Sequence, residues 1–479
     1  MPKIPSDTDS ARPAWLGSVR PGRDLIRFGL ALLLATAFGA VQVFVLPRRL
    51  SIITYGQYRA FLVYVSYLGI LHFGLVDGAY LRWAGRPVAQ ITREWKTIGR
   101  WVVALESAVV VIAIAAAAVL DNTLLRLDII ALALCAFFAN ATFLSAYALQ
   151  AAGDFRAAGR VAAAPPALIV VGILMVPMDS LASVLGVYVI AYAGTAVYSA
   201  LLVVRMMRAD SPAQIDTRDG PHLATLFRTG VHVLGAGVAA ALAQSADRLM
   251  LSITRPMASF ALYGFASTVT VMGGYATQAL SRVALSHAAH QPETQRARFF
   301  IRFYDLIAAA YGLGLLGEPA FEAIVVHMLP EYQDALPILR ALVVGLPVAV
   351  ATQVVLVGTL QSHTHVRRQS ALVVSSAMLM AVMCGVCITL GAPLRGVAAT
   401  ASMSAVVAFA LGIWMVVSRV PTFSTAASIR FLVLVALEGA AMLLANTVSA
   451  GWPLRTALLC LLAAAPTMIA LRAVRKQGW

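Results

Sequence analysis

Long runs of apolar residues, separated by short polar connections, follow one another along this chain from residue 24 to residue 473. A helix that crosses a bilayer needs about 20 mostly apolar residues, because lipid offers the backbone no hydrogen-bond partner. Runs of this length predict an all-α, polytopic membrane protein with about 14 spanning helices. The predicted spans are residues 24–47, 58–80, 99–120, 127–149, 161–177, 182–204, 224–247, 259–284, 302–327, 336–360, 371–390, 395–417, 429–449 and 453–473.

The first twelve spans form two similar sets of six. Arg27 to Gly29 opens the first set, and Arg228 to Gly230 opens the second. Later in each set, Leu149-Gln150 is matched by Leu360-Gln361, again after roughly 200 to 210 residues. An even number of helices in each set predicts two lobes of the same orientation, related by an axis along the membrane normal. We expect a substrate path along this axis.

The spans and their connections divide the chain into five parts. We predict a flexible cytoplasmic tail at 1–23, an N-lobe with helices 1 to 6 at 24–208, a cytoplasmic linker at 209–222 and a C-lobe with helices 7 to 12 at 223–418. Residues 419–479 hold helices 13 and 14 and a cytoplasmic C-terminus. The tail and the linker leave no room for a soluble catalytic domain, so we do not expect an enzyme.

Composition and charge indicate where the protein resides. Apolar residues make up 60% of the chain and charged residues 12%, whereas about a quarter of a soluble domain is charged. Cytoplasmic loops carry the Lys and Arg excess, which predicts that both termini are cytoplasmic. The net charge of +15 then reflects topology and anionic lipid headgroups, and no nucleic-acid partner is expected. The residues predicted to be cytoplasmic include Arg82, Arg86, Arg93, Lys96, Arg156, Arg160, Arg205, Arg208, Arg296, Arg298, Arg367 and Arg368.

Three local patterns suggest other chemistry, and each has a simpler explanation. Gly312 to Gly317 match GxGxxG, but they lie inside an apolar span, where small residues let helices approach closely. The CxxC pair that starts at Cys384 and the two histidines around Thr364 lack the further ligands of a zinc site. The sequence has no GxxxxGK[ST] motif for ATP. We therefore predict no cofactor and no metal.

Ionisable side chains at membrane depth are costly, so they are usually functional or paired. We assign six of them to a substrate cavity, namely Arg59, Arg282, Arg27, Arg248, Arg340 and His72. Arg59 and Arg282 are the strongest candidates, because they occupy equivalent spans of the two lobes. Three acids are candidates for ion coupling, namely Asp77, Asp247 and Asp305. Residues near a helix end have a structural alternative, since they could snorkel to the interface, cap a terminus or pair with another charge.

Several stretches resemble bacterial polysaccharide and O-antigen flippases of the Wzx type. They are Tyr55 to Arg82 in the first helical hairpin, Ser245 to Tyr263 at the start of the second lobe, and Glu331 to Gln361 at the junction of the ninth and tenth helices. The resemblance covers most of residues 24–420. It implies membership of the multidrug, oligosaccharidyl-lipid and polysaccharide (MOP) exporter superfamily, whose two six-helix lobes alternate between inward-open and outward-open V shapes.

The resemblance implies a flippase that moves undecaprenyl-pyrophosphate-linked oligosaccharide across the cytoplasmic membrane by alternating access. The product would be a surface polysaccharide such as the O-antigen of lipopolysaccharide or an exopolysaccharide, and the partners would be the lipid-linked substrate, membrane lipids and other polysaccharide assembly proteins. The membrane potential or an H⁺ or Na⁺ gradient would supply the energy.

Three alternatives remain open. Fourteen spans also resemble lipid II flippases, but the charged pattern of that branch's first helix is absent from Phe28 to Leu46. A multidrug antiporter of the same superfamily would favour acids over arginines in its cavity. A membrane-embedded sugar polymerase or ligase, from another class, would need a larger external loop than this sequence offers.

Overall fold

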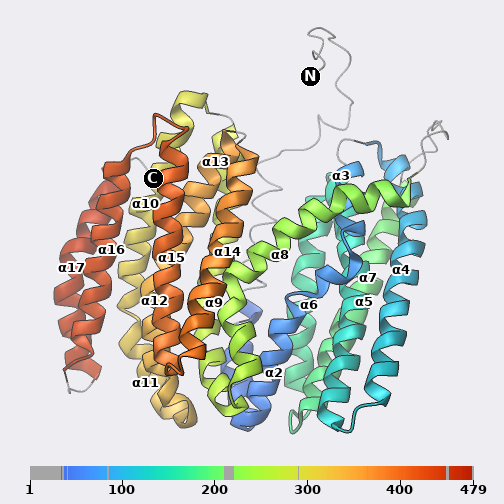
Figure 1. Ribbon diagram of the computed structural model, residues 1–479, viewed down its shortest axis with the longest axis horizontal. Helices are drawn as coiled ribbons and strands as arrows, with labels where there is room; N and C mark the ends of the chain where they lie inside the picture. The colour runs from blue at the N-terminus through green and yellow to red at the C-terminus, as the bar shows by residue number, and fades with distance from the viewer. Residues whose placement is uncertain are drawn as a thin grey trace.

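The computed structural model describes Leu34 and residues 37–39, 41–83, 86–209, 221–289, 291–363, 365–448 and 452–476. Within these ranges, the description excludes the side chains at 209, 272–283, 285–287, 289, 294, 366, 452 and 476. Every regular element in this part of the chain is helical, as the sequence predicts. The helices form two groups, and α8 runs diagonally between them (Figure 1).

The elements follow one another with short connections. They are α2 (Ile52–Val65), η2 (Leu68–His72), α3 (Leu75–Trp83), α4 (Val88–Ala118), α5 (Thr123–Ala151), α6 (Phe155–Met175), α7 (Leu181–Ala209), α8 (Leu223–Thr254), α9 (Met257–Ala289), α10 (Glu293–Leu315), α11 (Glu318–Met328), η3 (Pro330–Ala335), α12 (Leu336–Ala351), η4 (Thr352–Val357), α13 (Gly358–Ser362), α14 (Val366–Thr389), α15 (Leu394–Val417), α16 (Thr425–Ala445) and α17 (Trp452–Lys476).

The helices account for most of the predicted spans. In the described part of the chain, ten are long and apolar enough to cross a membrane, and two bent pairs raise the number to 12. Of the other two predicted spans, 259–284 is helical as part of α9, and 24–47 lies mostly outside the described residues. The prediction of an all-α, multi-pass membrane protein is confirmed.

The second predicted span is broken, so the expected continuous helix over 58–80 is wrong. Helix α2 starts where the Ser51 Oγ accepts a hydrogen bond from the Thr54 amide at 3.2 Å. The chain then bends by 64° between η2 and α3. Phe73 and Gly74 lie at this bend with φ values of 50° and 84°, a left-handed backbone that glycine adopts readily and phenylalanine rarely.

The predicted span 302–327 is also broken, since α10 and α11 are bent by 41°. Glu318 and Pro319 occupy the first turn of α11, a position that suits proline because its missing N–H would have no helical partner there. A third difference is that α4 starts at Val88, before the predicted 99, so that Arg93 and Lys96 lie on a helix and not in a loop. A helix satisfies its own backbone outside lipid too, so an apolar run locates a span but not the start of its helix.

Alternating helices give the bundle two ends. The arginine-rich end holds the connections from α3 to α4, α5 to α6, α7 to α8, α9 to α10, α13 to α14 and α15 to α16, and the α11 end holds those from α4 to α5, α6 to α7, α8 to α9, α14 to α15 and α16 to α17 (Figure 1). At the α11 end one apolar cluster contains residues of both halves, among them Tyr55, Tyr188, Phe260 and Tyr332. Leu226 of α8 is buried in a cluster with α3 to α7, so the first turns of the predicted C-lobe pack on the N-lobe.

The two halves approach each other through glycines. At the α11 end, a Cβ atom on Gly56 of α2 would lie 2.2 Å from the Met257 carbonyl oxygen of α9. At the arginine-rich end, a Cβ atom on Gly230 of α8 would lie 1.8 Å from the carbonyl oxygen of Gly74, just before α3. Both distances are too short for any side chain. Small residues therefore bring the backbones of the two halves into contact at both ends.

We predict that Gly230→Ala lowers the thermal stability of the purified protein by several degrees. The methyl group cannot fit against the Gly74 backbone, and forcing extra atoms into a packed contact costs about 1 to 3 kcal/mol. Gly235→Ala is the matched control, since it lies on the same helix with nothing within 4 Å of its Cβ position. Equal melting temperatures for the two variants in detergent would contradict the close contact between α3 and α8.

Candidate functional site between the two halves

Polar side chains from α2, the turn after it, α8 and α9 meet where the two halves touch. The Tyr67 hydroxyl lies 2.8 Å from the Ser245 Oγ, and the Tyr64 hydroxyl lies 3.3 Å from the Ser252 Oγ. Both serines donate to carbonyl oxygens of α8, so the tyrosines are the donors in these two pairs. We use the name polar seam for Arg59, Tyr64, Tyr67, Ser245, Asp247, Arg248, Ser252 and Tyr263.

Asp247 is the acid of the polar seam. It is buried, and its Oδ2 accepts a hydrogen bond of 2.5 Å from the Tyr263 hydroxyl of α9. Its Oδ1 is also buried and has no hydrogen-bond partner in the described part of the chain. Arg248 does not supply one, because its Nε lies 3.9 Å from this oxygen and its Nη2 donates to the Gln244 carbonyl.

Arg59 is the buried cation of the polar seam. Helix α2 directs it toward α9, where a Cβ atom on Gly264 would lie 3.1 Å from the Arg59 Cβ and Cγ. The residue is only 7% exposed, and its Nε has no hydrogen-bond partner among the described residues. The phenols of Tyr55 and Tyr188 lie within electrostatic range of its guanidinium. A guanidinium in this position retains donors with which it can bind an anion.

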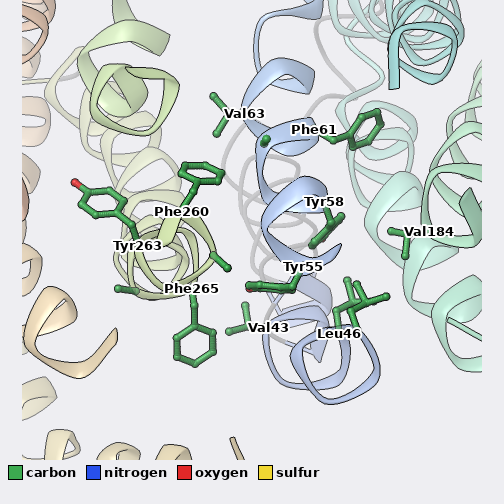
Figure 2. Close-up of a cluster of buried hydrophobic side chains, with 14 of the residues drawn as sticks. Val43, Leu46, Tyr55, Tyr58, Phe61, Val63, Val184, Phe260, Tyr263 and Phe265 are labelled. Atoms are coloured by element: carbon green, nitrogen blue, oxygen red, sulfur yellow. The ribbon is translucent and has the colours of Figure 1, made fainter. Parts of the chain in front are cut away.

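Aromatic side chains close the polar seam toward the α11 end. Figure 2 shows Tyr55, Tyr58 and Phe61 of α2 between Val184 on one side and Phe260 and Phe265 of α9 on the other. The Tyr55 ring lies 5.4 Å from that of Tyr332 in η3, and the Phe44 ring lies 6.2 Å from that of Phe321 in α11. Opening the halves at this end would have to separate these rings.

His72 and Asp77, one candidate for the substrate cavity and one for ion coupling, are neighbours at the bend between η2 and α3. The Nδ1 of His72 accepts a hydrogen bond from the Gly74 amide at 3.1 Å. Its Nε2 lies 3.9 Å from the Asp77 Oδ2, which is too long for a hydrogen bond. Both residues are buried. Their geometry therefore stabilises the bend, and their roles in substrate binding and ion coupling stay predictions.

Two further candidates are held by ion pairs within the second half. Arg340 of α12 contacts Glu318 at 2.7 Å and Glu322 at 2.8 Å, both on α11, and Glu322 also contacts Arg455 of α17 at 2.8 Å. Asp305 of α10 accepts a hydrogen bond of 2.6 Å from Arg430 of α16. This geometry favours the structural alternative for both residues. The Arg340 pairs are largely buried, and the Asp305 carboxylate is buried although Arg430 is half exposed, so loss of either partner would leave a charge uncompensated in the bundle.

Arg27 lies outside the described residues, and of Arg282 only the backbone, within α9, is described. The predicted central cavity includes the side chains of Arg27 and Arg282, so the described residues do not test it. Two other cavities stand out in the described part of the chain. One of about 540 Å³ lies between α12, α15 and α16, and one of about 460 Å³ lies between α4, α6 and α7.

Sequence reasoning missed the neutral members of the polar seam. Tyr64, Tyr67, Ser245 and Tyr263 carry no charge, so a search for ionisable residues at membrane depth passes over them. The spacing of Tyr64 and Tyr67, three residues apart, was the available signal. Two further acids within apolar spans have neutral donors in the structure, since Glu106 accepts from Asn140 at 2.6 Å and Glu438 accepts from Thr467 at 2.9 Å.

No family model matches the sequence, and no curated protein matches it significantly. Solved structures do match in fold. The lipid II flippase MurJ in an inward closed conformation gives a TM-score of 0.67 at 12% sequence identity, covering 93% of this chain and 99% of that chain. A multidrug transporter of the MATE family, DinF-BH, gives 0.59 at 13% identity and covers 87% of this chain and 99% of that chain.

An outward-facing multidrug resistance transporter of the MATE family and MOP superfamily gives a TM-score of 0.53 at 13% identity, covering 87% of this chain and 100% of that chain. The structural neighbours are therefore transporters of the MOP superfamily, and the chain has their fold. At such low identity the likeness extends to the fold alone.

We predict that Tyr263→Phe lowers the stability of the protein by about 1 to 3 kcal/mol, because it leaves the buried Asp247 carboxylate without its donor. Tyr332→Phe is the matched control, since the Tyr332 hydroxyl is buried and has no partner in the described chain. Thermal unfolding in detergent measures both effects. A Tyr263→Phe variant as stable as Tyr332→Phe would show that the bond to Asp247 contributes nothing.

Proposed function

We propose that this protein is a flippase that moves an oligosaccharide linked to undecaprenyl pyrophosphate from the cytoplasmic to the outer face of the bacterial cytoplasmic membrane. The two halves would open alternately to each side for the synthesis of a surface polysaccharide. Both termini would lie in the cytoplasm, with the arginine-rich end facing inward. The observation that carries the proposal is the buried Arg59 between the halves, which has no acidic partner among the described residues.

The physics of the substrate suits a buried arginine. Moving one charge through hydrocarbon costs between about 3 and 17 kcal/mol, depending on how water penetration is counted. Each 1.4 kcal/mol slows the crossing about tenfold, so the unaided rate is negligible. A guanidinium keeps its proton and binds phosphate oxygens through two parallel hydrogen bonds, so Arg59 would hold the headgroup in either conformation. Arg282, if it lies opposite, would add a second cation.

The weak contacts of the polar seam would allow the two halves to separate and close again during transport. The hydroxyl pairs of the polar seam join Tyr64 of α2 and Tyr67, just after α2, to serines of α8. Each pair is worth about 0.5 to 1.5 kcal/mol and can exchange with water when the halves separate. Asp247 and Arg248 lie beside them, so Asp247 is the best placed of the three candidates for ion coupling. Export of a pyrophosphate from a negative interior also gains about 2.3 kcal/mol per charge for each 100 mV.

A lipid II flippase is the second candidate. The solved lipid II flippase covers 93% of this chain, whereas the two multidrug transporters compared above cover 87%. The coverage describes the fold alone, so the choice of a flippase over a drug antiporter rests on the buried Arg59. Both flippase substrates carry a polyprenyl pyrophosphate, so Arg59 would bind the part that they share, and the glycan would distinguish them.

We predict that Arg59→Met abolishes surface polysaccharide or slows its export at least about tenfold, because one charged hydrogen-bonding contact is worth about 1.5 to 3 kcal/mol. Arg59→Lys should retain part of the activity, since it keeps the charge but loses the bidentate geometry. Export is measured as surface polymer in a strain that lacks the native gene. Arg93→Ala, an exposed arginine on α4, is the control for loss of positive charge.

Stability separates this prediction from a structural role. A buried guanidinium without an acidic partner is costly, and Arg59 has none among the described residues, so Arg59→Met should unfold at the same temperature as the wild type or at a higher one. Normal polymer in Arg59→Met would overturn the assignment of Arg59. Lost polymer together with a lowered melting temperature would assign the residue to folding and remove it from substrate binding.

A further inference from the structure

The cavity of about 540 Å³ between α12, α15 and α16 opens to the surface of the helix bundle. Met403 of α15 and Leu443 of α16 line it and are 55% and 42% exposed. Helices α12 and α15 pack tightly behind it, since the Ser402 Oγ donates to the Ala341 carbonyl at 2.6 Å. The cavity is therefore a groove between α15 and α16 with α12 as its floor.

The groove is polar at one end and apolar along the rest of its length. Arg395, Asn446 and Thr447 lie at the α11 end, and Val344 and Val406 lie deeper in the bundle. From Arg395 to Val406, α15 rises about 16 Å at 1.5 Å per residue. This length matches half of the roughly 30 Å hydrocarbon core, which is the depth of one leaflet.

The polar end of the groove carries Arg395, whose charge is not neutralised by an acid among the described residues. Other arginines at the α11 end are occupied, since Arg255 donates to the Ala392 carbonyl at 2.8 Å and Arg340 and Arg455 contact Glu318 and Glu322. Arg395 is exposed and makes no ion pair or hydrogen bond within the described part of the chain. The mouth of the groove therefore has a positive charge and the deeper part has an apolar wall.

We propose that this groove binds one anionic membrane phospholipid, with its phosphate at Arg395 and an acyl chain along α15. A lipid of one leaflet has the same arrangement as the groove, namely a charged head at the surface and a chain that ends near the midplane. The site is separate from the polar seam and does not depend on the transported substrate.

The test is native mass spectrometry of the purified full-length protein titrated with phosphatidylglycerol. Arg395→Ala should weaken binding about fivefold, the factor expected for one arginine at an anionic lipid surface. Arg419→Ala, just beyond the other end of α15, should leave binding unchanged. Ala399→Phe should reduce binding by placing a ring in the groove, whereas Val407→Phe, outside the lining, should not.

Several outcomes would overturn the proposal. Equal binding by Arg395→Ala and Arg419→Ala would remove the arginine from the site, and equal binding by Ala399→Phe and Val407→Phe would remove the groove. Phosphatidylcholine bound as tightly as phosphatidylglycerol would refute the anionic preference. Displacement of phosphatidylglycerol by a lower concentration of polyprenyl phosphate would assign the groove to the carrier lipid instead. None of these results depends on transport, so the proposed flippase activity stands or fails separately.

Discussion

A charge buried between helices in a membrane is tolerated only if something stabilises it, and this constraint sorts the ionisable residues of the protein. Asp305 and Arg340 have partners of opposite charge within the second half, and Asp247 has the Tyr263 hydroxyl. Arg59 is buried between the halves without an acidic partner in the described chain. Among the described residues, the protein therefore holds Asp305 and Arg340 in ion pairs and keeps Arg59, without an acidic partner, at the place where its halves meet.

The contacts around Arg59 differ in kind from one end of the bundle to the other. At the α11 end, aromatic rings from both halves pack together beside the close approach of Gly56 to α9. At the arginine-rich end, α8 crosses to the first half and packs on the backbone at Gly74. Between them lie hydroxyl pairs that are individually weak. Tight, separable surfaces on either side of weak polar contacts are what a transporter needs if it is to open on one side at a time.

The sequence allowed the fold to be predicted because bilayer thickness sets the length of apolar runs. The bends after His72 and Leu315 were missed, because the apolar runs continue through them and Phe73 gives no sign that its backbone is left-handed. The start of α4 was missed because its first turns carry polar residues, including Glu94, which Arg82 binds at 2.9 Å. Hydropathy indicates which segments can cross lipid. The two bends and the start of α4 depend instead on side-chain packing and ion pairing, which hydropathy does not indicate.

For the candidate site, the sequence predicted which charges lie at membrane depth but not which of them are paired. Arg340 and Arg59 look alike in the sequence, yet one faces two carboxylates and the other faces a glycine. Pairing depends on the relative rotation of helices far apart in the chain, which no local pattern encodes. The neutral tyrosines and serines of the polar seam were missed for the same reason.

The central claim is that the protein carries a pyrophosphate between its halves. Transport in proteoliposomes tests it most directly, by comparing one oligosaccharide on a polyprenyl pyrophosphate with the same oligosaccharide on an uncharged polyprenyl ether. The account predicts rapid crossing of the pyrophosphate-linked glycan and little crossing of the uncharged one. Equal rates for both lipids would contradict it.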